Sequence, residues 1–310
     1  MTKIYLITGF LGAGKSTYLN NLLTNSSKKT GVLINEFGKI SVDTVTLSSN
    51  GIDLVELKNG SIFCSCLKDK FIDGLIELIK MSLDEIYIES SGLADPSNIN
   101  NIVDIIRKQL PNTKYDFSGV ICLVDAVYFL KQLDVLESIR RQIQHSHMII
   151  INKIDLVDKD RLEKIQKVIS DINPQAKIIS SSYENHNYSL NKIASFEIAS
   201  EESTNTVMSR PNNLTVAFDN IESIDIISKF LTQCSDYLYR AKGYIVVENE
   251  NYKVDLVSHT LDIVKLYKEL FIKPEELNKI ILLISGGIKG SRHITQIVNS
   301  MSEHSITLTS

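Results

Sequence analysis

The segment Gly9–Ser16 constrains the fold of this chain more than any other, because it reads Gly-Phe-Leu-Gly-Ala-Gly-Lys-Ser. This order fits the pattern G-x-x-x-x-G-K-S/T at every fixed position, with an apolar run before it and an amphipathic run after it. Glycines let the chain wrap so closely that backbone N–H groups face phosphate oxygens, and a helix starting there adds partial positive charge. The segment therefore predicts a strand, a phosphate-binding loop and a helix in succession.

The side chains of this loop have distinct expected tasks. Lys15 would neutralise the β- and γ-phosphates, the Ser16 hydroxyl would join the Mg²⁺ shell, and Thr17 would contact the α-phosphate. The alternative, a glycine-rich turn with a surface lysine, is disfavoured by four matching positions in this context. The loop alone does not distinguish ATP from GTP. The expected nucleotide contacts of the segment are Gly12, Ala13, Gly14, Lys15, Ser16 and Thr17.

Apolar and amphipathic runs alternate along the first two-thirds of the chain. The apolar runs lack polar alternation, which is typical of strands covered on both faces; they span residues 4–8, 31–35, 54–57, 85–89, 118–124, 148–152 and 176–180. The amphipathic runs between them predict helices at residues 15–24, 67–81, 99–110, 127–144 and 159–171. This succession predicts an α/β P-loop NTPase fold with a doubly wound, mostly parallel sheet.

The composition changes near residue 200. Residues 200–213 are polar, contain a proline and show no periodicity, which indicates a linker between a nucleotide-binding domain at 1–199 and a smaller α+β domain at 214–310. In the smaller domain we expect strands at 214–218 and 279–285, a hairpin of 243–248 with 252–257, and helices at 221–238 and 294–301.

Residues 152–155, Asn-Lys-Ile-Asp, directly follow an apolar strand, and open α/β sheets bind ligands at that edge. The Asp155 carboxylate suits guanine, because it accepts from N1–H and the exocyclic amine together, whereas adenine would leave it unpaired. Asn152 would bridge to N7 or hold the loop, and the Lys153 stem would cover one face of the base. The alternative is a polar strand-to-helix loop in which Asp155 caps the helix. A backbone N–H near Ser181, at the end of the next strand, would meet guanine O6.

Residues 86–92, Ile-Tyr-Ile-Glu-Ser-Ser-Gly, are apolar up to an acidic residue and end in a glycine three positions later. Glu89 is therefore expected at a strand end, where it would hold the Mg²⁺ shell or orient water. The Gly92 N–H would reach a γ-phosphate. Asp95, in the turn that follows, is equally consistent with a helix cap.

Together these motifs resemble the CobW-like GTPases, metal chaperones related to the hydrogenase- and urease-maturation GTPases. The matching residues occur in that family's order and spacing through the whole nucleotide-binding half; they are residues 8–16, 35–38, 56–60, 89–96 and 152–155. The second half is similar more loosely, mainly at residues 240–243, Arg-Ala-Lys-Gly.

The resemblance implies further roles. Residues 35–38 would begin the first switch, Asp43 would be its acidic residue near Mg²⁺, and Glu89 would replace the aspartate usual in other P-loop proteins. Hydrolysis would be slow by itself and coupled to metal loading or delivery. The family is associated with Zn²⁺, Co²⁺ and cobalamin pathways.

The chain departs from the family's metal motif, Gly-Cys-x-Cys-Cys. Residues 60–66 read Gly-Ser-Ile-Phe-Cys-Ser-Cys, so only Cys64 falls on a motif cysteine, while Ser61 and Phe63 occupy the other two positions. Cys64 and Cys66 would still supply two thiolates from an extended segment, and a tetrahedral Zn²⁺ would need further donors such as Glu36 or a histidine. The alternative is a pair of partly buried thiols left from a lost site.

The charge and the cysteine count exclude several classes. Lys and Arg number 33 against 37 Asp and Glu, a net charge of −4, which disfavours non-specific nucleic-acid binding. No apolar run approaches the roughly 18 residues that a membrane span needs. Four cysteines are too few for a disulfide framework, and Cys122 and Cys234 lie in apolar segments typical of a core. We therefore expect a cytoplasmic protein with neither nucleic acid nor membrane as partner.

The sequence favours a Mg²⁺-dependent GTP-binding protein with slow hydrolysis that inserts a metal or cofactor into a client metalloenzyme. Lys15, Glu89 and Gly92 are the expected catalytic residues, and no glutamine is clearly placed to orient attacking water. The alternative is a nucleotide-gated scaffold or activator of a corrinoid protein or metalloenzyme that carries no metal itself. An ATP-dependent kinase on the same loop is a third hypothesis, and a homo-oligomer remains open.

Overall fold

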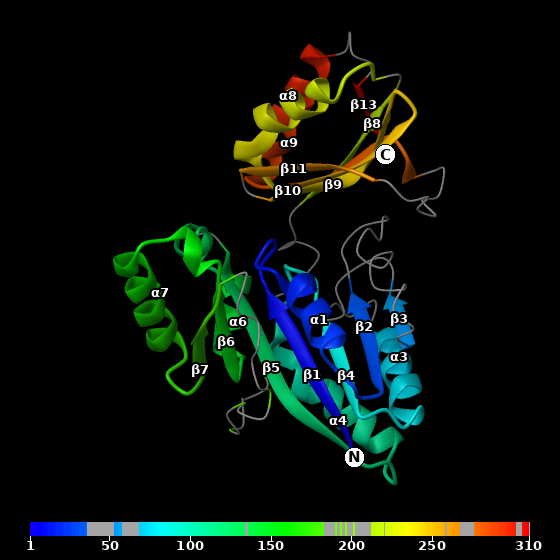
Figure 1. Cartoon of the computed structure of the whole chain (residues 1–310), viewed down its shortest axis with the longest axis vertical. Coiled ribbons are helices and arrows are strands. Elements are labelled where there is room, and N and C mark those ends of the chain that lie inside the picture. Colours follow the sequence, from blue (N-terminus) through cyan, green and yellow to red (C-terminus); the bar gives the residue numbers. More distant parts are fainter. Residues whose placement is uncertain are drawn as a thin grey trace. The chain divides into compact units, whose positions relative to one another are not determined.

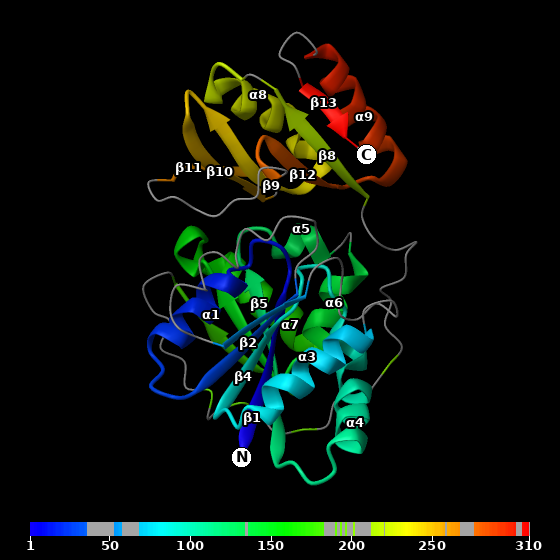
Figure 2. The ribbon, with the colours of Figure 1, turned by 90° about the vertical axis from the view of Figure 1, so that its right-hand side faces the viewer.

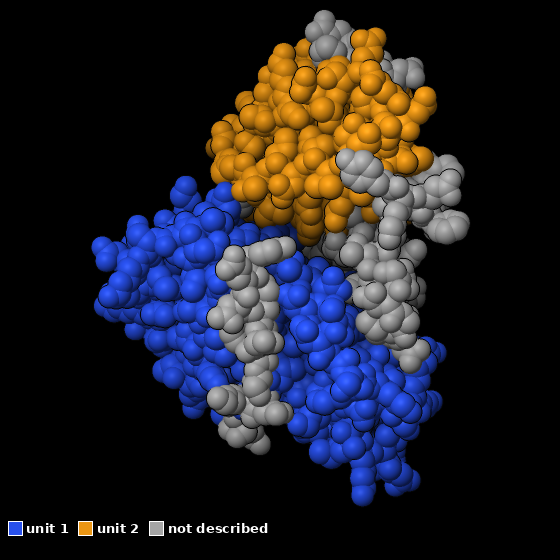
Figure 3. Space-filling model, in the orientation of Figure 1, with its two compact units in different colours: residues 1–209 blue, residues 210–310 orange. Residues whose placement is uncertain are grey.

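The computed structural model describes residues 1–35, 53–57, 68–133, 136–182, 190, 193, 196, 201, 212–219, 221–257, 259–266, 276–301 and 306–309. The chain divides into two compact units, Met1–Ser209 and Arg210–Ser310 (Figure 3). Each unit has its own sheet and its own apolar core. None of the helices in the described part of the chain has the length and apolar character to cross a membrane.

The first unit contains a seven-stranded sheet in the order β3-β2-β4-β1-β5-β6-β7, in which every neighbouring pair is parallel (Figure 1). Its strands are β1 (Thr2–Gly9), β2 (Thr30–Asn35), β3 (Asp53–Leu57), β4 (Glu85–Glu89), β5 (Tyr115–Asp125), β6 (Met148–Asn152) and β7 (Lys177–Ser180). Its helices are α1 (Lys15–Thr24), α3 (Lys68–Lys80), α4 (Ile99–Gln109), α5 (Phe129–Leu133), α6 (Glu137–Gln144) and α7 (Lys159–Ile172).

Helices cover both faces of this sheet. Along β1, Ile4 and Leu6 pack into one core with α3 and α4, whereas Tyr5 and Ile7 pack into another with α1. Figure 2 shows α1 on one side of the strands and α3 and α4 on the other. Side chains of alternate strand residues point to opposite faces, so an uninterrupted apolar strand fills both cores. The predicted doubly wound P-loop NTPase sheet is confirmed.

The helix expected at residues 127–144 is wrong as a single element. The structure has α5 and α6 instead, and Leu136, the residue before α6, has extended dihedral angles (φ −126°, ψ 110°). Apolar periodicity continues across a break of this kind when the next helix returns to the same core, so the pattern did not show it.

The second unit is a six-stranded antiparallel sheet in the order β11-β10-β9-β12-β8-β13, with helices on one face. Its strands are β8 (Asn213–Phe218), β9 (Leu238–Val247), β10 (Glu250–Val257), β11 (Thr260–Lys265), β12 (Lys279–Ile284) and β13 (Ile306–Thr309), and its helices are α8 (Ile224–Cys234) and α9 (Gly287–Ser300). Both helices pack over one core with these strands (Figure 1). The smaller domain is thus of the predicted α+β class.

Four details of this unit differ from the sequence prediction. One is α9, which begins at Gly287 and not at the expected residue 294. The helix expected at 221–238 spans only Ile224–Cys234: the Ser223 hydroxyl caps its start by accepting from the Asp225 N–H at 3.1 Å, and β9 begins at Leu238. The prediction also missed β11 and β13. The expected linker at 200–213 overlaps β8 by one residue, since that strand begins at Asn213.

Candidate functional site

The phosphate-loop segment joins β1 to α1, as its glycine pattern predicts. Gly14 precedes α1 in a left-handed conformation with φ 97°, which a glycine adopts without strain. A Cβ atom added at Gly14 would lie 2.5 Å from Asn152 Nδ2. Glycine is therefore required here both by the backbone angle and by a side chain from a distant part of the chain.

Lys15 is folded into this loop. Its ammonium donates to the carbonyl oxygens of Gly9 at 2.9 Å and Phe10 at 3.1 Å, and the residue is 8% exposed. The positive charge is thus held inside the turn that the sequence assigns to phosphate. Thr17, the third residue of α1, is exposed.

Ser16 and Glu89 lie together although 73 positions separate them. The Ser16 hydroxyl donates to Glu89 Oε1 at 2.8 Å. Glu89 ends β4, where it pairs in register with Ile7 of β1, and it is buried at 6% exposure. The two parallel strands therefore bring both predicted Mg²⁺-shell groups to one edge of the sheet. Hydroxyl and carboxylate oxygens are hard donors of the type that Mg²⁺ prefers, so this pair fits the ion.

The segment after Glu89 packs against the phosphate loop. The Ser90 N–H donates to Ile7 O at 2.9 Å, and its hydroxyl donates to Thr8 Oγ1 at 3.1 Å. A Cβ atom added at Gly92 would lie 2.5 Å from Leu11 Cδ2 and 2.7 Å from Leu11 N. The absence of a side chain at Gly92 thus permits this contact.

The base-loop residues 152–155 reach the phosphate loop through Asn152. Its Nδ2 donates to Ala13 O at 3.0 Å, and its Oδ1 accepts from the Lys153 N–H at 2.9 Å. Lys153 has a left-handed backbone with φ 61°, and its ammonium pairs with Asp125 Oδ2 at 2.7 Å. Two motifs that lie 139 positions apart are therefore joined directly by one amide side chain.

Asp155 is exposed to solvent, whereas Ser181 is buried. Asp155 is exposed in the first turn of the short 3-10 helix Ile154–Leu156, so its carboxylate faces solvent. The Ser181 N–H donates to Ile151 O at 2.7 Å, and Ser181 O accepts from the Ile154 N–H at 3.2 Å. The Ser181 N–H is therefore engaged by the sheet, and the contact from a backbone N–H near Ser181 to guanine O6 stays a prediction.

The predicted transition-metal ligands Glu36, Cys64 and Cys66, and the predicted switch residue Asp43, lie outside the described residues. Among the residues that are described, no three His, Cys, Asp or Glu side chains are grouped to hold a metal ion. Cys122 and Cys234 lie in the core as expected, and burial raises the pKa of each thiol to about 12.

The sequence analysis missed two polar residues that contact this region, Asp125 and Gln142. Asp125 ends the apolar strand β5, so the signal that identified Glu89 would have found it too. Gln142 lies within α6, is fully buried, and donates to the carbonyls of Gly92 and Ala94. Nothing in an amphipathic helix pattern marks such a glutamine.

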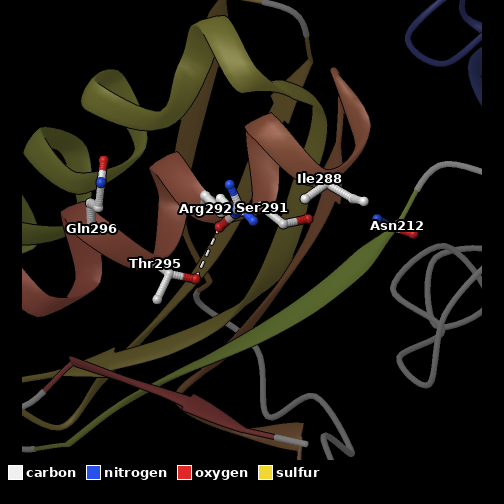
Figure 4. Close-up of a pocket in the computed structure, with 6 residues that line it drawn as sticks. All are labelled: Asn212, Ile288, Ser291, Arg292, Thr295 and Gln296. Atoms are coloured by element: carbon white, nitrogen blue, oxygen red, sulfur yellow. Dashed lines mark hydrogen bonds between the residues drawn. The ribbon is translucent and has the colours of Figure 1, made fainter.

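The second unit has a shallow hollow along α9. It is lined by Asn212, Ile288, Ser291, Arg292, Thr295 and Gln296 (Figure 4). The Thr295 hydroxyl in this hollow donates back to Ser291 O at 2.9 Å. None of the expected nucleotide contacts lines it.

Comparisons with known proteins find relatives named as zinc chaperones. The zinc chaperone YjiA of Escherichia coli (strain K12) is 28% identical over 267 residues, covering 80% of this chain and 82% of that protein. The zinc chaperone CobW of Sinorhizobium sp is 32% identical over 198 residues, and the chain spans about half of that protein, 54%. A crystal structure of Zn(II)-bound YjiA GTPase from E. coli covers 98% of each chain at 22% identity, with a TM-score of 0.48.

The family comparison covers the larger part of the chain. The profile described as "CobW/HypB/UreG, nucleotide-binding domain" matches residues 3–180, which run from β1 through β7. The match includes the phosphate loop, Glu89 and the base loop. By this match over more than half of its length, the chain belongs to the CobW/HypB/UreG family.

Proposed function

We propose that this chain binds Mg²⁺·GTP, hydrolyses GTP slowly, and uses the cycle to insert a metal or cofactor into a client metalloenzyme. One observation carries the nucleotide part: Asn152 Nδ2 donates to Ala13 O at 3.0 Å, so the base loop and the phosphate loop border one site. A phosphate cradle beside a guanine-type loop suits a guanine nucleotide.

The proposed catalytic roles follow from charge and hydrogen bonding. Lys15 and the backbone N–H groups of Gly12, Ala13 and Gly14 stabilise the charge that develops on the β–γ bridge. Ser16, Glu89 and Asp43 hold Mg²⁺, which neutralises phosphate charge when bound. The Gly92 N–H contacts the γ-phosphate. Turnover is slow, since these groups bind phosphate and metal but do not activate water strongly.

Calorimetry with GTP, GDP and ATP in magnesium buffer tests the nucleotide part. We expect GTP and GDP to bind and ATP to bind weakly.

Lys15→Ala should abolish hydrolysis and greatly weaken binding, whereas Asp155→Asn should mainly reduce the preference for guanine. A preference for ATP would favour a kinase instead, and indifference to GTP would refute the proposal.

The delivery part of the proposal is supported by relatives named zinc chaperones and "Zinc-regulated GTPase metalloprotein activator 1". The cargo would be Zn²⁺ or Co²⁺, bound through Cys64 and Cys66 with Glu36, and the partner would be a client metalloenzyme or corrinoid protein.

A thiol titration of the native protein shows whether the chain itself carries the metal. Cys122 and Cys234 are buried with pKa values raised to about 12, so a thiol reagent should leave them unmodified in the native protein, and any thiol that reacts is Cys64 or Cys66. If the chain carries Zn²⁺, the metal should protect both thiols in a nucleotide-dependent way. A Cys64→Ser/Cys66→Ser variant should neither react nor bind Zn²⁺ or Co²⁺.

The departure from the metal motif favours a second candidate. Ser61 and Phe63 replace two motif cysteines, and neither residue is a good ligand for a soft metal. The chain would then be a nucleotide-gated scaffold that activates a corrinoid protein or metalloenzyme without carrying metal. Absence of metal binding in every nucleotide state, with GTP binding intact, would select this candidate.

A further inference from the structure

We propose that Gln142 is a positioning residue for the γ-phosphate, acting through the backbone of Gly92. The inference rests on the proposed GTP binding and adds a residue that lies outside every nucleotide motif. It predicts that α6, and not only the sheet edge, determines how the site distinguishes GTP from GDP.

The first observation is where Gln142 directs its amide. The side chain comes from α6, and the residue is 0% exposed. Its amide nitrogen, Nε2, donates to Gly92 O at 3.2 Å and to Ala94 O at 2.9 Å. An amide NH₂ has two hydrogens, so both bonds form at once. The reversed amide would place its oxygen against two carbonyls, so the chemistry allows only this orientation.

The second observation is what lies on the other side of Gly92. A Cβ atom there would be 2.7 Å from the backbone nitrogen of Leu11, in the phosphate loop. Gly92 is thus enclosed between that loop and the Gln142 amide. Sheet hydrogen bonding ends two residues earlier, where the Ser90 N–H donates to Ile7 O at 2.9 Å.

These contacts give Gln142 a task that packing alone does not explain. A buried amide needs partners inside the protein, and both donors of Gln142 go to one short segment about 50 positions away. With the Gly92 carbonyl held, the Gly92–Leu93 peptide plane is held as well. The Gly92 N–H belongs to the preceding peptide, so with the Gly92 Cα confined by Leu11 it can move only by rotation about the Gly92 φ bond. A contact to a γ-phosphate depends on this placement, whereas contacts to the α- and β-phosphates come from the other loop.

The experiment compares Gln142→Met with Gln144→Met in the full-length chain. Methionine nearly preserves the volume and removes both donors. Gln144 lies on the same helix but is exposed and donates to Glu201 at 3.3 Å, away from the phosphate loop. The measurements are the Kd values of GDP and GTPγS, the single-turnover rate of GTP hydrolysis, and the thermal midpoint.

For Gln142→Met we expect GDP affinity within about twofold of wild type and a loss of GTPγS affinity on the order of tenfold, as for one or two lost hydrogen bonds. Hydrolysis should fall by a similar factor or more. The Gln144→Met variant should match wild type in all of these. If methionine prevents folding, Gln142→Leu, which is also of similar volume and has no donor, should give the same separation.

Three outcomes would overturn the inference. Unchanged GTPγS affinity and hydrolysis would show that the two hydrogen bonds do not matter to the γ-phosphate. Equal losses for GDP and GTPγS would show a general structural role. If the wild-type protein binds neither nucleotide, the proposed function fails and this inference fails with it. If the wild-type protein binds both nucleotides and Gln142→Met has the same affinities and hydrolysis rate, only the inference is refuted.

Discussion

Asn152 shows how much of this site depends on single side chains. Its amide links two loops that no local structure would bring together, with one donor on Ala13 O and its oxygen on the Lys153 N–H. The sequence motif predicted both loops, and it allowed Asn152 either to contact the base or to hold the loop. The structure shows Asn152 holding the loop, and its contact with the base stays a prediction. The loop contact depends on the distance between two strand ends and so is not visible in the motif.

Gly14→Ala should weaken nucleotide binding more than it weakens the fold. An alanine there adds left-handed strain of about 1 kcal/mol. Its Cβ would also lie 2.5 Å from Asn152 Nδ2 and displace the bond to Ala13. We expect a loss of GDP affinity on the order of tenfold, measured by calorimetry.

Gly287→Ala is the matched control for this substitution. Gly287 also has a positive φ, 58°, but an added Cβ there meets nothing within 4 Å. Gly287→Ala should lower the free energy of unfolding by an amount similar to that for Gly14→Ala, and it should leave the nucleotide affinity unchanged. Equal nucleotide losses in both variants would contradict the role given to Asn152.

At the scale of elements, the parallel strands were easier to predict than the helices and the edge strands. Strands such as β4 and β6 are uniformly buried, so an apolar run identifies them directly. The edge strand β11 alternates between exposed and half-buried residues, and its Leu and Ile are interrupted by Asp262. That alternation was present in the sequence, but a run of six residues beside a hairpin gives a weak signal.

The start of α7 depends on one capping side chain. Asp158 Oδ1 accepts from the Arg161 N–H at 2.7 Å, directly after the base loop. Asp158→Ala should lower the free energy of unfolding by about 1 kcal/mol. Asp160→Ala, an exposed aspartate in the same first turn, should cost only a few tenths. Urea unfolding followed by circular dichroism measures both, and equal costs would argue against the cap.

At the scale of the whole molecule, the nucleotide motifs lie in the first unit, and no described residue of the second belongs to them. The composition change near residue 200 predicted a boundary. It did not predict that Glu201 stays with the first unit, where its N–H donates to Ser97 O at 3.1 Å and its carboxylate pairs with Arg141. A polar residue in a polar stretch has no signal for such a contact.

The first unit should lose stability in mild acid through His147. Burial lowers the pKa of His147 below its ordinary value of 6.5. Its Nδ1 accepts from the Val120 N–H at 3.0 Å, so a proton on Nδ1 would break that bond. Because the unfolded chain binds the proton more readily, stability is full above about pH 7 and falls as the pH drops through the ordinary value.

Urea midpoints measured between about pH 7 and pH 5 test this expectation. His147→Gln should reduce the slope, and part of it should remain because burial also lowers the pKa of His145. A wild-type midpoint that does not vary with pH would contradict the assignment.

The attachment of Glu201 matters to anyone who wants to produce the first unit alone. A gene fragment ending at residue 199, where the composition changes, would delete the carboxylate that faces Arg141 and the N–H that Ser97 O accepts. The Arg141 side chain, which is only 20% exposed, would then lose one of its carboxylate partners. The stop codon therefore belongs beyond Glu201.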